Sequence, residues 1–200
     1  MQISFRHYNG SFLVTFIVTT ALVTAICLQS LEAVLQWLPS VSTVAVVGAV
    51  LSLYDRWLWK PLPYLLTVRD ISGRYIGELV SSYKDVAENA RAEIIVEVHQ
   101  TASTVVVRQF TRDRTQSWTQ SQSRSYHLYR RADGSHTLSF AYQNEGVHPR
   151  TTKHEHWGFC IMDFYADHQC AHGHYFTDRQ PQTSGKIELE FQQRRLKGGP

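Results

Sequence analysis

The chain has 200 residues, a length that allows one core of about 140 residues with an appendage. Its formal net charge of +3 is too small to indicate a DNA- or RNA-binding protein. Its three cysteines, Cys27, Cys160 and Cys170, are odd in number and widely spaced, which excludes the disulfide framework of a small secreted domain. Free thiols are expected, with a Cys160–Cys170 pair across a hairpin as the alternative. The charge is uneven, because residues 1–60 hold three Lys or Arg and two Asp or Glu, whereas residues 61–200 hold 17 and 15.

Two apolar runs occupy the first third of the chain. The first, residues 12–28, reads FLVTFIVTTALVTAICL, and the second, residues 41–58, is charged only near its end. Each is long enough for a helix to cross a bilayer, so the sequence predicts a two-helix transmembrane hairpin over 1–62. A cleaved signal peptide is one alternative for the first run. A soluble amphipathic hairpin is disfavoured, because neither run has a wide polar face.

The flanking charges predict the orientation of this hairpin. Arg6 precedes the first run, Arg56 and Lys60 follow the second, and the connecting turn has neither Lys nor Arg. Because positive charge stays on the cytoplasmic side, both termini are expected in the cytoplasm. Small residues four apart in the second run, such as Ala45 and Ala49, would let helices pack closely, either within the hairpin or between protomers.

Pro61 should end the second helix, and the rest of the chain is predicted to be strands. Runs rich in β-branched and aromatic residues recur between turn signals, and Asp133-Gly134 is a hairpin signal. The expected strands are 73–82, 91–99, 103–111, 121–130, 136–143, 153–164, 170–178 and 185–192. The predicted fold is therefore a transmembrane hairpin followed by an all-β antiparallel barrel of about eight strands over 63–200, lipocalin-like and wide enough for one small ligand.

Alternation predicts which side chains face the barrel interior. Ile187, Leu189 and Phe191 should face inward, and the inward face of the 136–144 strand should carry four residues together. These four are Leu138, Phe140, Tyr142 and Asn144.

Histidines and cysteines concentrate between residues 154 and 174. His154 and His156 are two apart, as are Cys170, His172 and His174, so each set would project to one side of a strand. Such a set could bind zinc, although these residues could equally decorate a barrel wall, and we assign no metal. No nucleophile elbow, phosphate loop or paired-carboxylate motif is present, so no enzyme and no cofactor are expected.

Five residues suggest a ligand site. Tyr175, Thr177 and Arg179 share one side of a strand, and Tyr142 and Asn144 share a side of another. Arginine binds phosphate oxygens, tyrosine offers a face for stacking, and asparagine reads a base edge, so the set suits a nucleotide. The alternative is that both tyrosines are core or rim residues and Arg179 is solvated.

Four segments in this order after two apolar runs resemble the two-transmembrane β-barrel effectors of bacterial CBASS, the anti-phage systems that signal through cyclic oligonucleotides. The segments read DISGRYIGEL, LSFAYQNEGVHP, HEHWGFCIMDF and GHYFTDRQPQTSGKIELEF, and the resemblance covers nearly the whole chain.

The resemblance implies a function. A cyclic dinucleotide from a partner nucleotidyltransferase would bind the cytosolic barrel and drive homo-oligomers that breach the bacterial inner membrane, killing the infected cell. By motif position, Tyr142, Asn144, Tyr175, Thr177 and Arg179 would contact the ligand. Matching positions expected to be structural are His156, Gly158, Gly173 and Gly185. Competing interpretations are a membrane-tethered lipocalin-like carrier of an apolar molecule and an adaptor that binds proteins.

Overall fold

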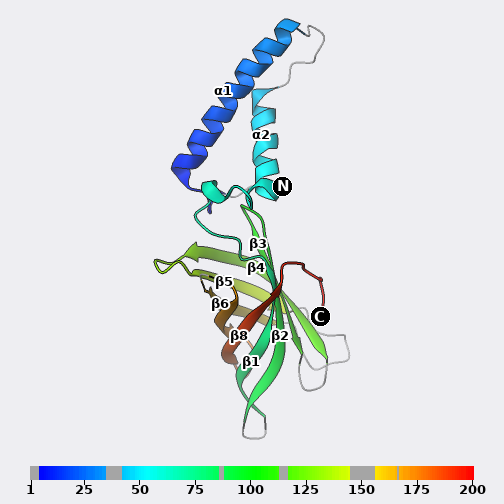
Figure 1. Ribbon diagram of the computed structural model, residues 1–200. Helices are drawn as coiled ribbons and strands as arrows, with labels where there is room; N and C mark the ends of the chain where they lie inside the picture. Colours follow the sequence, from blue (N-terminus) through cyan, green and yellow to red (C-terminus); the bar gives the residue numbers. More distant parts are fainter. Residues whose placement is uncertain (1–4, 35–41, 86–87, 113–116, 145–155, 166) are drawn as a thin grey trace. The chain divides into compact units, whose positions relative to one another are not determined.

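The computed structural model describes residues 5–34, 42–85, 88–112, 117–144, 156–165 and 167–200. These residues form two compact units (Figure 1). The helical unit comprises Met1–Thr67 together with Thr101–Thr104, and the barrel unit comprises Val68–Gln100 together with Val105–Pro200.

The helical unit contains two main helices. Helix α1 spans Gly10–Val34 and helix α2 spans Thr43–Leu53, which continues directly into a π-helical turn at Tyr54–Leu58. A short 3-10 helix, Pro63–Leu65, follows. Helix α2 and its π-helical turn therefore end before Pro61, as predicted, because proline cannot donate a backbone hydrogen bond.

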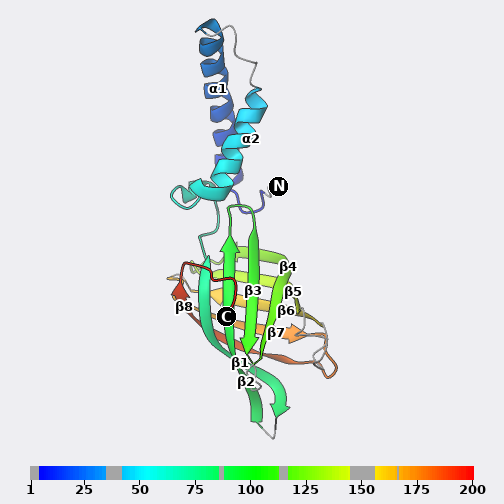
Figure 2. The same ribbon diagram turned by 90° about the vertical axis from the view of Figure 1, so that its right-hand side faces the viewer.

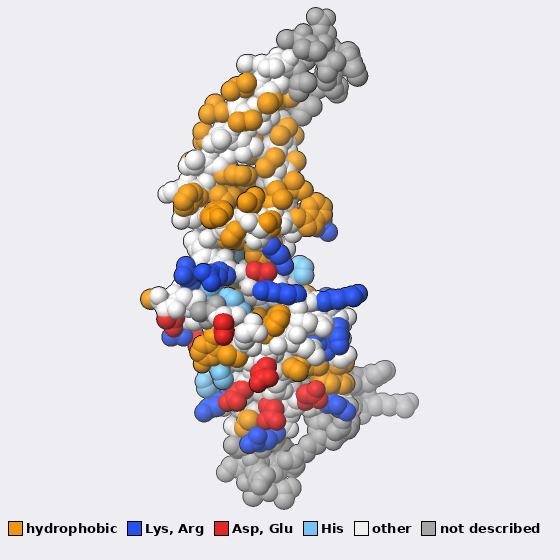
Figure 3. All heavy atoms as spheres, viewed as in Figure 1, with side chains coloured by type: hydrophobic (Ala, Val, Ile, Leu, Met, Phe, Trp, Pro, Cys, Tyr) orange, Lys and Arg blue, Asp and Glu red, His pale blue; other side chains and the backbone are white. Residues whose placement is uncertain are grey.

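One helix among the described residues is long and apolar enough to cross a membrane, and it is Gly10–Ser30 within α1. Large apolar side chains such as Phe12, Val18 and Leu22 are exposed along it, and Figure 3 shows hydrophobic side chains over the surfaces of both helices. The second predicted span is not confirmed, because α2 has 11 residues and positions 35–41 lie outside the described part of the chain.

A cluster of aromatic side chains packs together near the start of α1 and just after α2. Tyr54 lies with its ring centroid 6.1 Å from that of Tyr8 and 6.0 Å from that of Phe16, and its hydroxyl donates to the Leu62 carbonyl at 2.7 Å. Trp59 is 1% exposed in the same cluster. The segments before α1 and after α2 are thereby held together.

Residues Thr101–Thr104 belong to this helical unit although they join two strands of the barrel along the chain. Ala102 N–H donates to the Asp55 carbonyl at 3.1 Å, and the Thr101 hydroxyl donates to Asp55 Oδ1 at 3.3 Å. Asp55 is 1% exposed. The turn is therefore bonded to the π-helical turn that ends the second helix.

The barrel unit is a closed antiparallel barrel in which each of eight strands pairs with its neighbours in chain order and β8 pairs with β1 (Figure 2). The strands are β1 Gly73–Asp85, β2 Glu88–Gln100, β3 Val105–Arg112, β4 Trp118–Arg130, β5 His136–Asn144, β6 His156–Phe164, β7 Cys170–Thr177 and β8 Ser184–Gln193. A strand is present in each of the eight predicted places, and the hairpin at Asp133-Gly134 is confirmed, with Gly134 at a φ of 86°. Some predicted bounds differ; for example, β3 begins at Val105 rather than at residue 103, and residues 153–155 of the predicted 153–164 strand lie outside the described residues.

The barrel interior is filled by side chains that alternate along each strand. Strand β5 shows the pattern clearly, since Leu138, Phe140, Tyr142 and Asn144 are all buried on one face as predicted. Ile187 and Leu189 are buried, and the partly buried Phe191 packs against the same core. The interior is therefore a packed core rather than an open pore.

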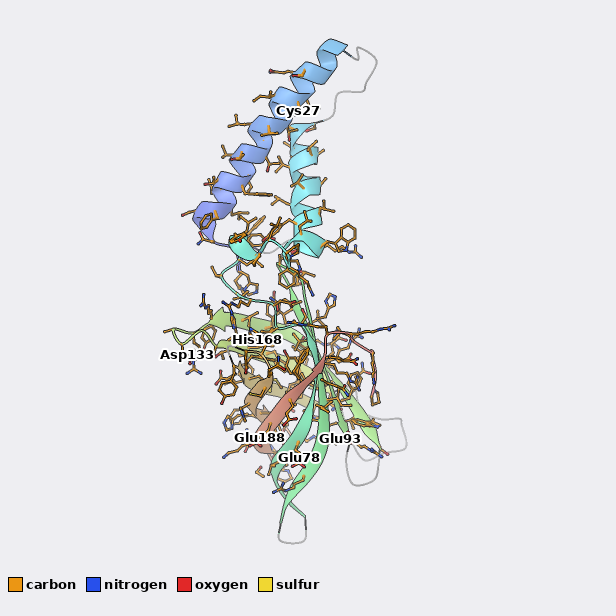
Figure 4. The ribbon with its side chains drawn as sticks, in the orientation of Figure 1. Cys27, Glu78, Glu93, Asp133, His168 and Glu188 are labelled. Carbon is orange, nitrogen blue, oxygen red and sulfur yellow. The ribbon has the colours of Figure 1, made fainter. Side chains whose placement is uncertain are left out.

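Charged side chains cover much of the outer wall (Figure 3). Glu78, Glu93 and Glu188 come from three neighbouring strands and are labelled in Figure 4. Arg91 pairs with Glu78 at 3.1 Å, and both side chains are well exposed. Such exposed pairs contribute little to stability.

One ion pair on this wall is buried. Arg74 Nη1 lies 2.8 Å from Glu97 Oε1, and the two side chains are 4% and 2% exposed. The Lys197 and Gly198 N–H groups donate to the Glu97 carboxylate, and the Gly199 carbonyl accepts from Arg74. The last residues of the sequence therefore satisfy the hydrogen-bonding groups of this pair.

Candidate ligand-binding site

The structure brings the five predicted ligand residues together at one end of the barrel. Tyr142 and Asn144 end β5, and Tyr175 and Thr177 end β7, all with buried side chains 6–7% exposed. Arg179 follows β7 and is partly exposed. Tyr142 and Asn144 lie on the predicted inward face, and Tyr175 and Thr177 share a side as predicted. Whether these residues contact a ligand stays a prediction.

Two glycines make room for the two tyrosines. A Cβ on Gly158 would lie 2.2 Å from Tyr142 Cζ, and a Cβ on Gly185 would lie 2.5 Å from Tyr175 Cε1. Both glycines pair across strands near the rings, Gly158 with Tyr142 and Gly185 with Tyr175. Each ring therefore lies flat over a position without a side chain.

A row of inward polar residues crosses four neighbouring strands at this end. Gln109 on β3 pairs with Ser121 on β4, Ser121 pairs with Asn144 on β5, and Asn144 pairs with His156 on β6. All four are buried. Asn144 Nδ2 donates to Ser121 Oγ at 3.0 Å. Buried amide, hydroxyl and imidazole groups in one row can exchange internal hydrogen bonds for bonds to a polar ligand.

Arg179 joins this polar row through His156. The distance between Arg179 Nη2 and His156 Nδ1 is 3.0 Å, and the guanidinium donates because it has no acceptor. The His156 ring in turn lies edge-on to Tyr142 with centroids 6.5 Å apart. One cation, one imidazole and one aromatic face therefore meet at a single place.

The electrostatics keep the tyrosines neutral. Burial raises the pKa of Tyr142, and the neighbouring Cys160 and Tyr175 add to this, while Arg179 acts in the opposite direction. Burial also raises the pKa of Tyr175, partly offset by a hydrogen bond with Ser81 and by the charge of Arg179. Both phenols therefore act as neutral donors and stacking faces at physiological pH.

The sequence interpretation missed Gln109 and Ser121 and assigned His156 a structural role. A signal for Gln109 existed, since it interrupts the apolar alternation of Val105 and Val107 on an inward face. Ser121 lies in a segment of small polar residues that carries no such contrast. Only the strand register shows that it adjoins Asn144.

The two histidine sets do not converge. His156 faces the interior, whereas His172 and His174 are exposed on the outer face of β7, and His154 lies outside the described residues. Among the residues that the structure describes, no three His, Cys, Asp or Glu side chains are grouped so as to hold a metal ion.

The fold is therefore that of a small closed β-barrel with a packed core and a polar end that carries Arg179. The model of the family described as Cap15, cyclic dinucleotide receptor domain, matches residues 66–191. The chain therefore belongs to this CBASS effector family. No curated protein and no solved structure matches the chain.

Proposed function

We propose that this protein is a membrane-bound effector of bacterial anti-phage defence. A cyclic dinucleotide from a partner nucleotidyltransferase binds the barrel, the bound copies associate into homo-oligomers through their helices, and the helices disrupt the inner membrane and kill the infected cell. The protein acts as a receptor without turnover, cofactor or nucleic-acid partner, and its other contact is membrane lipid.

The observation that carries this proposal is the meeting of Arg179, His156 and Tyr142 at the end of the polar row. A cyclic dinucleotide offers charged phosphates, polar base edges and flat rings in a compact form. The guanidinium suits a phosphate, the tyrosine ring suits a base face, and Asn144 and Gln109 suit a base edge. The membership of residues 66–191 in a cyclic dinucleotide receptor family supports the same ligand.

The membrane part of the proposal is supported by α1. We infer that residues 41–58 form the second span, with α2 and the π-helical turn as its described part, and that both termini lie in the cytoplasm with the barrel. Ligand must bind the assembled state more tightly than the single copy, because equal affinity for both states would shift nothing.

The site is tested by Arg179→Ala in the full chain, with binding of cyclic di-AMP, cyclic di-GMP, cyclic GMP–AMP and cyclic di-UMP measured in detergent. Loss of a charge-assisted phosphate contact should weaken binding of the preferred ring by about 10-fold or more. The matched control is Arg124→Ala, which removes an exposed arginine that donates to Gln143 at 3.1 Å on the outer wall. It should leave binding unchanged.

The cellular outcome is tested by co-expressing the chain with a cyclic-dinucleotide synthase and following the entry of a membrane-impermeant dye. Wild type and Arg124→Ala should admit dye only when the synthase is active, and Arg179→Ala should not. Full affinity of Arg179→Ala for the preferred ring would contradict the site. Binding of apolar molecules with no affinity for any ring would favour the tethered carrier instead.

A further inference from the structure

Strands β6 and β7 carry exposed apolar side chains on their outer face. Trp157, Phe159 and Ile161 on β6 and Phe176 on β7 are 49%, 43%, 38% and 46% exposed. Phe159 pairs directly with Phe176 across the two strands, which are neighbours in the barrel (Figure 2). We call these four residues the β6–β7 outer patch. Contiguous exposed apolar residues of this size mark interaction surfaces.

The same two strands carry candidate ligand residues on their inner face. His156 alternates with Trp157 along β6, and Tyr175 and Thr177 flank Phe176 along β7. The Trp157 N–H donates to Asp178 Oδ1 at 2.9 Å, and the Asp178 N–H donates to the Trp157 carbonyl at 3.1 Å. Asp178 directly precedes Arg179. A ligand that draws on Arg179 therefore acts on the backbone that positions Trp157.

We propose that the β6–β7 outer patch is the contact between the barrels of two copies of this chain, each presenting the same patch to the other. This inference rests on the proposed function, and it names the assembly surface coupled to the ligand site.

The absence of charge in the patch favours a second copy as its occupant. None of its four side chains is charged, and the β5 neighbours that pair with Trp157 and Phe159 are Gln143 and Ala141. On the β7 side Ile161 pairs with His174, and Lys186 lies one strand further on, opposite His174. A two-fold contact brings each residue near its own equivalent. The four side chains of the patch therefore meet their own equivalents without like-charge repulsion among themselves.

The size of the patch explains why such a contact would depend on ligand. Large side chains that are half exposed offer on the order of 100 Å² each, so the patch offers roughly 400 Å², about half of what each partner contributes to a stable interface. The patch alone is too small for a dimer in solution. Copies anchored by α1 share one membrane, where their effective concentration is high enough for a weak contact to matter.

The test uses full-length copies carrying donor or acceptor dyes in phosphatidylethanolamine–phosphatidylglycerol vesicles, with the ring that binds best in the panel above. Phe159→Lys should keep ligand affinity within about twofold and lose the ligand-induced energy transfer, because it places like charges at the two-fold contact. The matched control is Tyr129→Lys, since Tyr129 is also 43% exposed on the outer wall. It should leave both readouts unchanged.

Mixing Phe159→Lys copies with Phe159→Glu copies should restore energy transfer, because opposite charges then face each other only if the patch contacts itself. Unimpaired transfer by Phe159→Lys, equal loss by Tyr129→Lys, or no recovery on mixing would overturn the interface. Ligand affinity and ligand-induced energy transfer together distinguish a wrong interface from a wrong proposed function. A wild-type chain that binds no ring contradicts the function, whereas ligand-induced assembly that survives Phe159→Lys contradicts only the interface.

Discussion

A side chain at position 158 would occupy the space that the Tyr142 ring fills, because a Cβ there would lie 2.2 Å from Tyr142 Cζ. Gly158→Ala should therefore displace the ring, destabilise the barrel by about 1–3 kcal/mol and weaken ligand binding by about 10-fold. Affinity and thermal unfolding measure these effects.

In a Tyr142→Ala background, Gly158→Ala should add little to either loss, because the clashing ring is gone. Gly199→Ala serves as the control, since its Cβ would meet no atom within 4 Å. Equal effects of Gly158→Ala with and without the tyrosine would show that the ring is not what the glycine accommodates.

His136 lies buried among groups that oppose its protonation. Its Nε2 accepts from the Arg69 N–H at 3.1 Å, and its Nδ1 has no hydrogen-bond partner among the described residues. Burial, and then the charges of His168, Arg130 and Arg69, lower the pKa of His136 from 6.5 to about 4. The folded barrel therefore holds this imidazole neutral.

This depressed pKa gives stability a pH dependence. The unfolded chain binds a proton below about pH 6.5 and the folded chain only below about 4. The contribution is therefore complete above 6.5 and is lost as the pH falls toward 4, by about 3 kcal/mol at most. His136→Gln keeps an acceptor for the Arg69 N–H. In this variant the thermal-denaturation midpoint should fall less between pH 7 and pH 4.5 than it does in the wild type. The control His174→Gln changes an exposed histidine and should leave the pH dependence of the midpoint as in the wild type. If His136→Gln also left this pH dependence unchanged, His136 would not be its cause.

Among the elements, the segment after β8 has a defined role. Burial of Glu97 tends to raise its pKa, but hydrogen bonds from the Lys197 N–H, Arg74 and the Gly198 N–H outweigh this and lower the pKa overall. Deleting residues 197–200 would leave the buried carboxylate with fewer donors. We expect a loss of about 1–3 kcal/mol in the free energy of unfolding.

A double-mutant cycle checks the origin of that loss. If the segment acts through the carboxylate, the deletion should cost less in a Glu97→Gln background than in the wild type, as measured by thermal unfolding. Additive losses would place the role of the segment elsewhere.

The strands and their inward faces were predictable because the alternation of large apolar residues with smaller or polar ones is local, as at Leu138, Phe140 and Tyr142. The polar row was not, because Gln109, Ser121 and His156 become neighbours only through the register of four strands. The second span over 41–58 stays a prediction, because the described helix α2 covers Thr43–Leu53 and changes to π geometry at Tyr54. Hydropathy does not report such a change in helix type.

At the scale of the whole molecule, the candidate ligand residues and the proposed assembly patch occupy opposite faces of one pair of strands. In this proposal, ligand binding and assembly use the two faces of β6 and β7, and successive residues of a strand lie on opposite faces. The proposed ligand contacts and the proposed assembly contacts are therefore adjacent along the backbone. The sequence could predict this alternation but not the outer patch, which was recognised only from the exposure of its side chains.

The turn Thr101–Thr104 has a consequence for dividing the chain. The helical unit is assembled from two stretches, Met1–Thr67 and Thr101–Thr104, which are separated in the sequence by strands β1 and β2. A fragment that stops at Thr67 would therefore lack the Ala102 N–H and the Thr101 hydroxyl that donate to Asp55. Because Asp55 is 1% exposed, its carbonyl and carboxylate would be left without these donors, and such a fragment would be less stable than the same residues in the full chain.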